Sequence, residues 1–309
     1  MSVATALCAV PLGDIYRYID ARGELAFAGS FCQARPFFEG LAAAHDGNRW
    51  GYLGTHGQWR IAPAFDDACD FSEGVASVCQ QGRWRFVDAQ GRTTGEATFA
   101  ALGPLRHGLA RAAQQGRWGY VDRRGGWRIA PAWDDAFDFS EGLGRVERGG
   151  RSAFVDDRGL VTAAGWHAEA GDFVDGVAPV RDGDHWGYVN RQGVPCIGAA
   201  WREARSFAEG LGPVRSDAGW GFVQNTGRVA IAPRFAQVQG FSEGLAAVQL
   251  PTESGMRWSY VGRDGRAVVA ARFAWATPMH GGLALAHDGA GMTVIHRTGV
   301  IVFSEEPTG

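Results

Sequence analysis

The sequence contains no lysine, so all 30 basic residues among its 309 are arginine. Methionine is also scarce, and no apolar run reaches the roughly 18 residues that a membrane-spanning helix requires. Without lysine there is no phosphate-binding G-x-x-x-x-G-K signature, and G-x-S-x-G and H-E-x-x-H are missing as well. These absences lead us to expect a protein that is not an enzyme and does not span a membrane.

Cysteine is sparse, and its spacing excludes two further classes. Five cysteines are an odd number, and none forms a C-x-x-C pair, which argues against a disulfide framework and a structural zinc site. Reduced thiols fit a cytoplasmic protein. The apolar N-terminal stretch has no basic residue before it, so we do not expect a signal peptide. The formal net charge of −3 favours neither nucleic acid nor an acidic membrane as a partner.

The sequence is built from copies of one unit. The phrase WRIAPAFDDACDFSEG (59–74) returns as WRIAPAWDDAFDFSEG (127–142). The glycine of the EGL motif, or its equivalent, recurs every 34 residues from Gly40 to Gly244, and four extra residues near Pro251 make the single slip in the period. We therefore predict a single tandem-repeat domain over 1–309, with nine repeats at approximately 4–37, 38–71, 72–105, 106–139, 140–173, 174–207, 208–241, 242–279 and 280–309.

Local patterns indicate that each repeat is a β-meander rather than a helix pair. Glycine is frequent, with 46 residues, and disfavours helix interiors. In one repeat we expect a first strand at GLARA (108–112), a second at WGYVD (118–122) and a third at WRIA (127–130). The turn DRRG (122–125) places Asp first and Gly fourth, as a type I turn with a bulge requires.

The predicted fold class is all-β, with nine three-stranded meanders of about 34 residues. The sequence leaves open whether they close as a β-propeller-like ring or wind as an open superhelix. Trp118 and Tyr120 share one face of their strand, while Gly119 and Val121 share the other. We expect the aromatic face of one repeat to pack on the small-residue face of the next, which would bury the tryptophans. The repeat at RSAFVD (151–156) lacks the Trp-Gly pair.

The repeats resemble the WG repeat family, also called KWG repeats. The resemblance rests on RWGYVD (117–122), HWGYVN (185–190), GWGFVQ (219–224), FSEGLAAV (241–248) and the IAP motifs at 61–63, 129–131 and 231–233. It covers essentially the whole chain, with Arg where the family usually has Lys. The family is mainly bacterial and a role in protein interaction is presumed for it. The resemblance thus implies a scaffold that binds another protein. We expect no cofactor and no metal, because the sequence has no cofactor-binding signature and its His and Cys residues show no metal-ligand spacing.

Two recurring acidic features have alternative interpretations. The clusters DDACD (66–70) and DDAFD (134–138) could bind a hard cation, but they lack calcium-loop spacing and are more typical of connector turns capped by Asp. The glutamate of the SEG motif recurs, as at Glu73 and Glu141. A general acid needs one unusual environment, whereas this glutamate recurs in several repeats. The recurrence favours a structural role, either accepting hydrogen bonds from backbone N–H groups or pairing with Arg.

A row of basic residues is the candidate binding site. Five arginines and one histidine precede the tryptophan position at the hairpin tips: Arg49, Arg83, Arg117, Arg151, His185 and Arg257. Such a row suits recognition of carboxylates, so we predict a protein partner with an acidic surface. The alternative is that each arginine stacks on an aromatic ring or pairs with a nearby Glu. A different function would be a small-ligand or carbohydrate-binding, lectin-like protein that stacks sugars on exposed tryptophans.

Overall fold

The computed structural model describes residues 7–305, so the first residues of the predicted repeat at 4–37, and part of the N-terminal stretch, lie outside the described residues. All regular elements in 7–305 are β-strands, and no helix long and apolar enough to cross a membrane is found there. The chain divides into two compact units. Unit 1 comprises Met1–Ala26, Val177–Asn190 and Pro195–Gly309, and unit 2 comprises Phe27–Gly176 and Arg191–Val194. That 1–309 is one domain stays a prediction.

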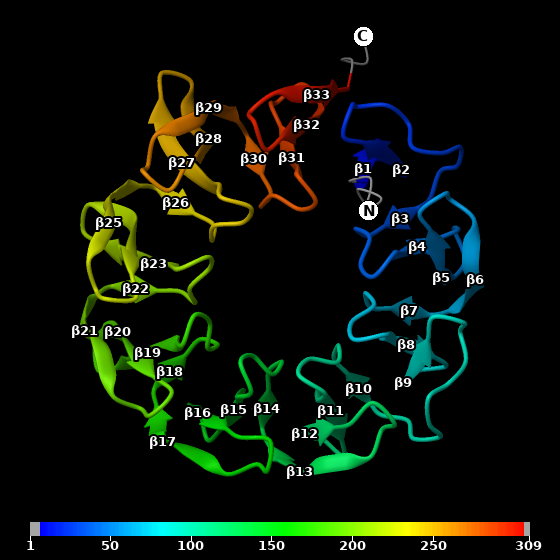
Figure 1. The fold of residues 1–309 in the computed structure, drawn as a ribbon, viewed down its shortest axis with the longest axis horizontal. Coiled ribbons are helices and arrows are strands. Elements are labelled where there is room, and N and C mark those ends of the chain that lie inside the picture. Colours follow the sequence, from blue (N-terminus) through cyan, green and yellow to red (C-terminus); the bar gives the residue numbers. More distant parts are fainter. Residues whose placement is uncertain (1–6, 306–309) are drawn as a thin grey trace, which may run out of the picture. The chain divides into compact units, whose positions relative to one another are not determined.

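Unit 2 consists of successive small antiparallel sheets (Figure 1). Its strands are β3 (Gln33–Ala34), β4 (Leu41–His45), β5 (Trp50–Gly54), β6 (Trp59–Phe65), β7 (Asp67–Ala68), β8 (Val75–Gln80), β9 (Arg83–Asp88), β10 (Ala101–Leu102), β11 (Ala110–Gln114), β12 (Arg117–Val121), β13 (Trp127–Trp133), β14 (Asp135–Ala136), β15 (Gly144–Arg148), β16 (Arg151–Val155), β17 (Val161–His167) and β18 (Glu169–Ala170).

Unit 1 is built in the same way. Its strands are β1 (Leu7–Leu12), β2 (Ile15–Asp20), β19 (Val177–Asp182), β20 (His185–Asn190), β21 (Pro195–Trp201), β22 (Glu203–Ala204), β23 (Leu211–Ser216), β24 (Gly219–Gln224), β25 (Val229–Phe235), β26 (Gln237–Val238), β27 (Ala246–Thr252), β28 (Gly255–Val261), β29 (Ala267–Phe273), β30 (Trp275–Ala276), β31 (Leu283–His287), β32 (Met292–His296) and β33 (Ile301–Ser304).

The predicted all-β meander is confirmed, and the structure adds one strand to it. The sheet β10-β11-β12-β13 contains the three expected long strands, in sequence order, preceded by a two-residue strand. The connector that follows β13 supplies the equivalent short strand of the next sheet, Asp135–Ala136. Seven of the nine sheets in residues 7–305 therefore have the four-stranded architecture of a β-propeller blade, while β7-β8-β9 has three strands and β1-β2 has two. The predicted Asp turn is also present, because the Gly125 N–H donates to the Asp122 carbonyl at 2.9 Å and the Asp122 carboxylate accepts the N–H groups of Arg124 and Gly126.

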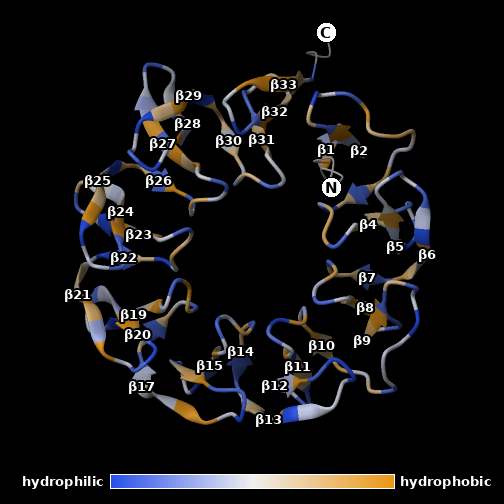
Figure 2. Ribbon diagram, viewed as in Figure 1, coloured by the Kyte–Doolittle hydropathy of each residue, from blue (hydrophilic) through white to orange (hydrophobic). Residues whose placement is uncertain are grey.

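The core lies between successive sheets, as the strand faces predict. Leu109, Tyr120 and Trp133 of one sheet cluster with Val146 and Ala153 of the next. The Tyr120 side chain is fully buried, and its hydroxyl donates to the Phe137 carbonyl at 2.8 Å. Tyr52, Tyr188 and Tyr260 make the equivalent bond in their own repeats. Figure 2 shows apolar residues concentrated on the strands and polar residues on many of the turns between them.

The glycine of the Trp-Gly pair is required by a contact within its own sheet rather than by packing on the neighbouring repeat. A methyl group placed on Gly119 would lie 2.4 Å from the carbonyl oxygen of Ile129, in the outer strand of the same sheet. At Gly51, Gly187 and Gly221 the nearest backbone oxygen would lie 2.7, 2.7 and 2.5 Å away. The ladder between β12 and β13 shifts register on either side of Tyr120. Glycine is required because the outer strand crosses this close to β12.

The repeat that lacks the Trp-Gly pair has adjusted its outer strand. Ala153 pairs with Trp166, whereas Gly119 has no partner in the β12–β13 ladder. Gly165 stands where Pro131 stands in the repeat before it, and adopts a φ of 74°, which glycine tolerates at little cost. Ser152, at the tryptophan position, is only 3% exposed. The smaller residues therefore belong to a repacked site.

We expect the double variant Ser152→Trp, Ala153→Gly to lower the melting temperature. An indole at a buried serine position overpacks the core and should cost about 1–3 kcal/mol. The control is Ala153→Gly alone, which should cost less, about 0.5–1 kcal/mol. A raised melting temperature in the double variant would show that the site has kept the geometry of its neighbours.

In unit 1 the strands nearest the N-terminus pack on those nearest the C-terminus. Val10 and Ile19 of the hairpin β1–β2 form a buried cluster with Leu283, Met292 and Val294. Figure 1 shows β1 and β2, in dark blue, beside β31 and β32, in red. The hairpin is therefore held by a sheet made from the far end of the sequence.

Candidate functional site

The recurring Glu-Gly pair forms a tight turn before the first long strand of five repeats, at Glu39, Glu73, Glu141, Glu209 and Glu243. Glu73 and Gly74 both have positive φ, at 52° and 76°. Ser72 and Val75 exchange both backbone hydrogen bonds across them. Positive φ at two central residues defines a type I′ turn, in which glutamate is an uncommon first residue. The cost of this backbone conformation calls for a compensating role of the carboxylate.

That role is to bind the equivalent turn of the next sheet. The Glu73 carboxylate accepts the N–H groups of His107 at 2.6 Å and Gly108 at 2.9 Å. Glu39 accepts the Gly74 N–H in the same way, and Glu209 accepts those of Glu243 and Gly244. The predicted structural role of these glutamates is therefore confirmed. Charge-assisted bonds from turn to turn therefore fix these sheets to their successors.

An arginine from the following sheet completes most of these turns. Arg191 Nη2 donates to the Glu141 carbonyl at 2.7 Å and lies 3.1 Å from its carboxylate. Arg123 donates to the Glu73 carbonyl, and Arg263 lies 3.9 Å from the Glu209 carboxylate. In each case the arginine directly follows the first residue of the turn between the second and third long strands, as Arg123 follows Asp122. Three repeats thus share one Glu–Arg arrangement.

At Glu39 this arrangement is incomplete, and a hollow of about 400 Å³ takes its place. Ala89 stands at the arginine position, and Gly54 stands where Asp88 and Asp122 begin the turn in the next two repeats. The hollow is lined by Glu39, Gly40, Leu41, Gly54, Thr55, His56, Gln58, Arg60 and Ala89. All of them belong to unit 2. Volumes of this order are typical of small-ligand pockets.

The acidic clusters are occupied by contacts within the protein. Asp134 pairs with Arg117 and accepts the Gly149 N–H, and the Asp135 carboxylate accepts the Ala136 N–H. Asp138 lies 3.0 Å from Arg111. Across residues 7–305, no group of three or more potential ligands is arranged to hold a metal ion. The carboxylates serve as turn caps and ion-pair partners.

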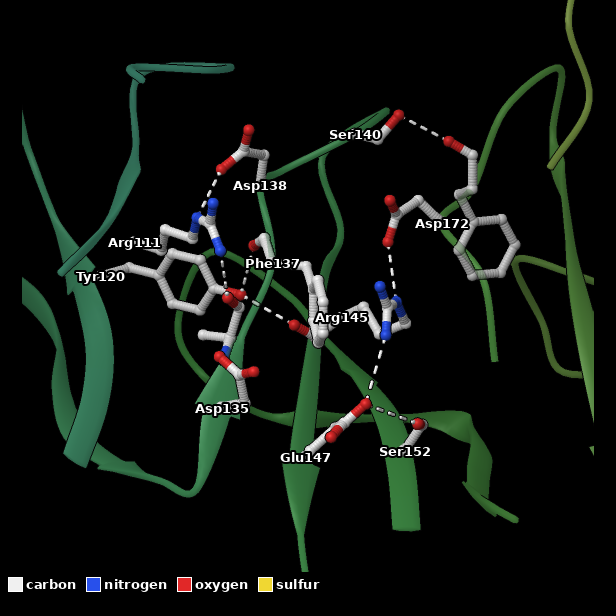
Figure 3. A network of polar contacts seen from close by, with 12 residues as sticks. Arg111, Tyr120, Asp135, Phe137, Asp138, Ser140, Arg145, Glu147, Ser152 and Asp172 are labelled. Atoms are coloured by element: carbon white, nitrogen blue, oxygen red, sulfur yellow. Dashed lines mark hydrogen bonds and ion pairs between the residues drawn. The ribbon is translucent and has the colours of Figure 1, made fainter. Parts of the chain in front are cut away.

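Two neighbouring sheets carry arginines at a strand position that is small or apolar elsewhere. Figure 3 shows Arg111 beside Asp138, and Arg145 between Asp172 and Glu147. The Arg145 side chain is 13% exposed, and its guanidinium carbon lies 3.2 Å from the centre of the Phe137 ring. Burial raises the pKa of the Asp138 carboxyl, which Arg111 partly opposes. These pairs join sheets across the core, so they support the scaffold rather than present a surface.

The predicted basic row is present at the hairpin tips. Arg49, Arg83, Arg117, Arg151 and His185 are exposed, and Arg257 is half-buried. Arg49 pairs with Asp66 and Arg117 with Asp134. These two arginines therefore each pair with the first Asp of an acidic cluster. Pairing with a nearby Glu was the alternative considered from the sequence. Arg151 donates to the Trp166 carbonyl at 2.6 Å and Arg257 to that of Met256 at 3.0 Å.

Arg83 is the arginine of the row with the fewest contacts. It begins β9 and pairs with Gln80 across the tip, and within residues 7–305 its guanidinium makes no ion pair. The tips lie at the opposite end of the strands from the hollow: His45 faces Trp50 at the tip, whereas Leu41 faces Gly54 beside the hollow. The basic row and the hollow are separate features.

The hollow was not predicted from the sequence, although a signal for it exists. Sequence reasoning concentrated on residues that recur, and the hollow arises where two recurring residues are missing. Aligning the repeats puts Ala89 level with Arg123, and Gly54 level with Asp88. Departures from the repeat, rather than the repeat itself, mark this site.

The fold and these turns define a tandem-repeat all-β protein with blade-like sheets, and comparison with known proteins identifies the repeat. Residues 50–84, 118–151, 186–218 and 220–250 match the family model described as "WG containing repeat". These four segments are therefore WG repeats. No curated protein matches it.

Solved structures share the fold at low sequence identity. A structure titled "Crystal structure of the eukaryotic initiation factor" is similar with a TM-score of 0.67 and 12% identity, over 98% of this chain and 96% of that one. A "Dihydro-heme d1 dehydrogenase NirN in complex with DHE" is similar with a TM-score of 0.50 and 14% identity, over 86% of this chain and 73% of that one. At these identities the likeness concerns the fold alone.

Proposed function

We propose that this WG repeat protein is a non-enzymatic scaffold that binds another protein through its hairpin tips. The observation that carries the proposal is the contrast within each repeat. One end of the strands is fixed to the next sheet by carboxylate bonds such as Glu73 to Gly108, while the other end presents exposed tips of varied sequence. Loops held on a rigid framework are where binding residues usually lie.

The chemistry of the tips supports a partner with an acidic surface. Arg49, Arg83 and Arg117 occupy the same position in three successive repeats, and Arg83 is free of a local ion pair among the described residues. An incoming carboxylate competes with Asp66 and Asp134 at the other two positions. Arg83 should therefore contribute most.

We expect the variant Arg83→Ala to weaken binding of the partner more than Arg49→Ala or Arg117→Ala. Losing one charge-assisted contact at an exposed rim should cost about 0.5–1 kcal/mol, and the triple variant should also show a weaker dependence on salt. Partners are recovered by pull-down with the full chain, and affinity is measured by calorimetry at two salt concentrations. A folded triple variant with unchanged affinity and salt dependence would move the binding face elsewhere.

The carbohydrate-binding alternative depends on exposed tryptophan. Trp50 and Trp220 are buried and the other tryptophans of the Trp-Gly motif are half-buried, while Trp59 and Trp275 are exposed at 37% and 39%. The distribution gives the scaffold the stronger support. Quenching of Trp59 or Trp275 fluorescence by a sugar would favour the alternative.

A further inference from the structure

We propose that the hollow beside Glu39 binds the guanidinium group of an arginine side chain supplied by a partner protein. The inference rests on the proposed scaffold function, because that function supplies the partner protein that carries the arginine. The choice of guanidinium comes from three other repeats, in which an arginine of this chain occupies the equivalent position.

The three filled sites define the expected contacts. Arg191 reaches both the carbonyl and the carboxylate of Glu141. Arg123 reaches the Glu73 carbonyl, and its Nη2 lies 2.8 Å from a methyl group placed on Gly74. Arg263 approaches the Glu209 carboxylate and lies over the Phe241 ring, 5.8 Å from its centre. A guanidinium between a Glu-Gly turn and the next sheet is therefore a recurring arrangement of this protein.

The hollow preserves the receiving half of that arrangement. Glu39 has the same positive φ as its equivalents, at 53°. It accepts the Gly74 N–H at 2.8 Å through Oε2. The side chain that would fill the space ends at Cβ because residue 89 is alanine. Gly54 removes a second side chain, the turn-capping aspartate. The space beside Gly54 is taken by the Gln58 and Arg60 side chains, 2.9 and 3.0 Å from where a Cβ would lie, so the hollow depends chiefly on Ala89.

Guanidinium is a better match than a compact ammonium. At Glu141 a carbonyl and a carboxylate oxygen both lie within reach of Arg191 Nη2, and the planar fork of arginine carries further N–H groups that can donate to neighbouring acceptors. Arg60 and His56 also line the hollow and are exposed. Their charge opposes a cation, so they limit the affinity rather than create it. We therefore expect weak binding by the isolated group, strengthened when it is part of a larger protein.

The test uses a single capped arginine, N-acetyl-arginine-N-methylamide, without any partner. We expect saturable shifts in the NMR amide signals of Gly40, Gly54 and Thr55, with a dissociation constant on the order of 1–10 mM. Capped citrulline, which is neutral but of similar shape, should bind about fivefold more weakly or worse. Equal binding of citrulline, or shifts caused by capped glutamate and not by arginine, would overturn the proposal.

Variants of this chain provide matched controls. Glu39→Gln keeps the shape and removes the charge, and should weaken capped arginine about fivefold or more. Ala89→Arg should fill the hollow from within, as Arg123 does, and abolish the shifts. Arg123→Ala should open a second hollow at Glu73 and add shifts at Gly74. Arg60→Ala removes a like charge and should leave binding equal or tighter. Unchanged binding in both Glu39→Gln and Ala89→Arg would contradict the site.

These outcomes separate the site from the scaffold function. If capped arginine fails to bind while a pull-down still recovers a partner that requires Arg83, the scaffold stands and the hollow is not a guanidinium site. If capped arginine binds and no protein partner is found, the site stands and the proposed scaffold function fails.

Discussion

Replacing Gly119 with alanine should destabilise the protein by about 3 kcal/mol or more. The added methyl group would lie 2.4 Å from the Ile129 carbonyl oxygen and 2.8 Å from the Pro131 nitrogen. Both are backbone atoms of β13, so no side chain can rotate away, and the outer strand has to move. The loss is measured as a lower free energy of unfolding in urea.

The chain contains its own control for this prediction. Ala153 occupies the equivalent position, and there it pairs with Trp166 of the outer strand, which passes through Gly165 at a φ of 74°. Ala153→Gly should therefore cost only about 0.5–1 kcal/mol, the entropy of a flexible residue in a strand. Similar losses for Gly119→Ala and Ala153→Gly would show that the close approach of β13 does not explain the glycine.

Trp220→Ala should cost about 3–5 kcal/mol, because it removes a fully buried indole. Trp220 is 1% exposed and packs in a cluster with Phe222, Phe235 and Val248. The guanidinium of Arg205 lies 4.1 Å from the centre of its ring. The variant therefore loses apolar burial and a cation–π contact together.

Trp118→Ala is the comparison. The repeat alone predicts the same cost at both positions, but Trp118 is only half-buried. We expect its loss to be smaller, about 1–3 kcal/mol. Both variants are measured by the same urea titration. Equal losses would mean that burial in the folded structure does not decide the contribution of these tryptophans.

The period was sufficient to predict the meander, because strands and turns depend on residues close together in the sequence. The Asp122 turn was predicted for this reason. The packing of Tyr120 on small residues of the next sheet was predicted from the two faces of its strand, one aromatic and one small. For the recurring glutamates, the sequence suggested either accepting backbone N–H groups or pairing with arginine. Both are found: Glu73 accepts backbone N–H groups, and Glu141 pairs with an arginine. Which turn supplies the N–H groups depends on how sheets stack, and the sequence does not state that.

The candidate site was less predictable. The basic row lies at exposed tips as expected, but its pairing with Asp66 and Asp134 required the path of the connector. The hollow depends on Ala89 and Gly54 lying beside Glu39, and these residues are far apart in the sequence. Repeats also hide differences in burial, so Trp118 and Trp220 look alike until their neighbours are known.

The hairpin β1–β2 also has a consequence for the order of events on the ribosome. Val10 and Ile19 are buried against Leu283 and Val294, which are translated long after them. During synthesis the apolar face of the hairpin stays exposed until these residues have been translated. Contacts between residues so far apart in the sequence also form slowly. Uncovered apolar surface is also what chaperones recognise and what aggregates. The hairpin is therefore synthesised well before the residues that bury it.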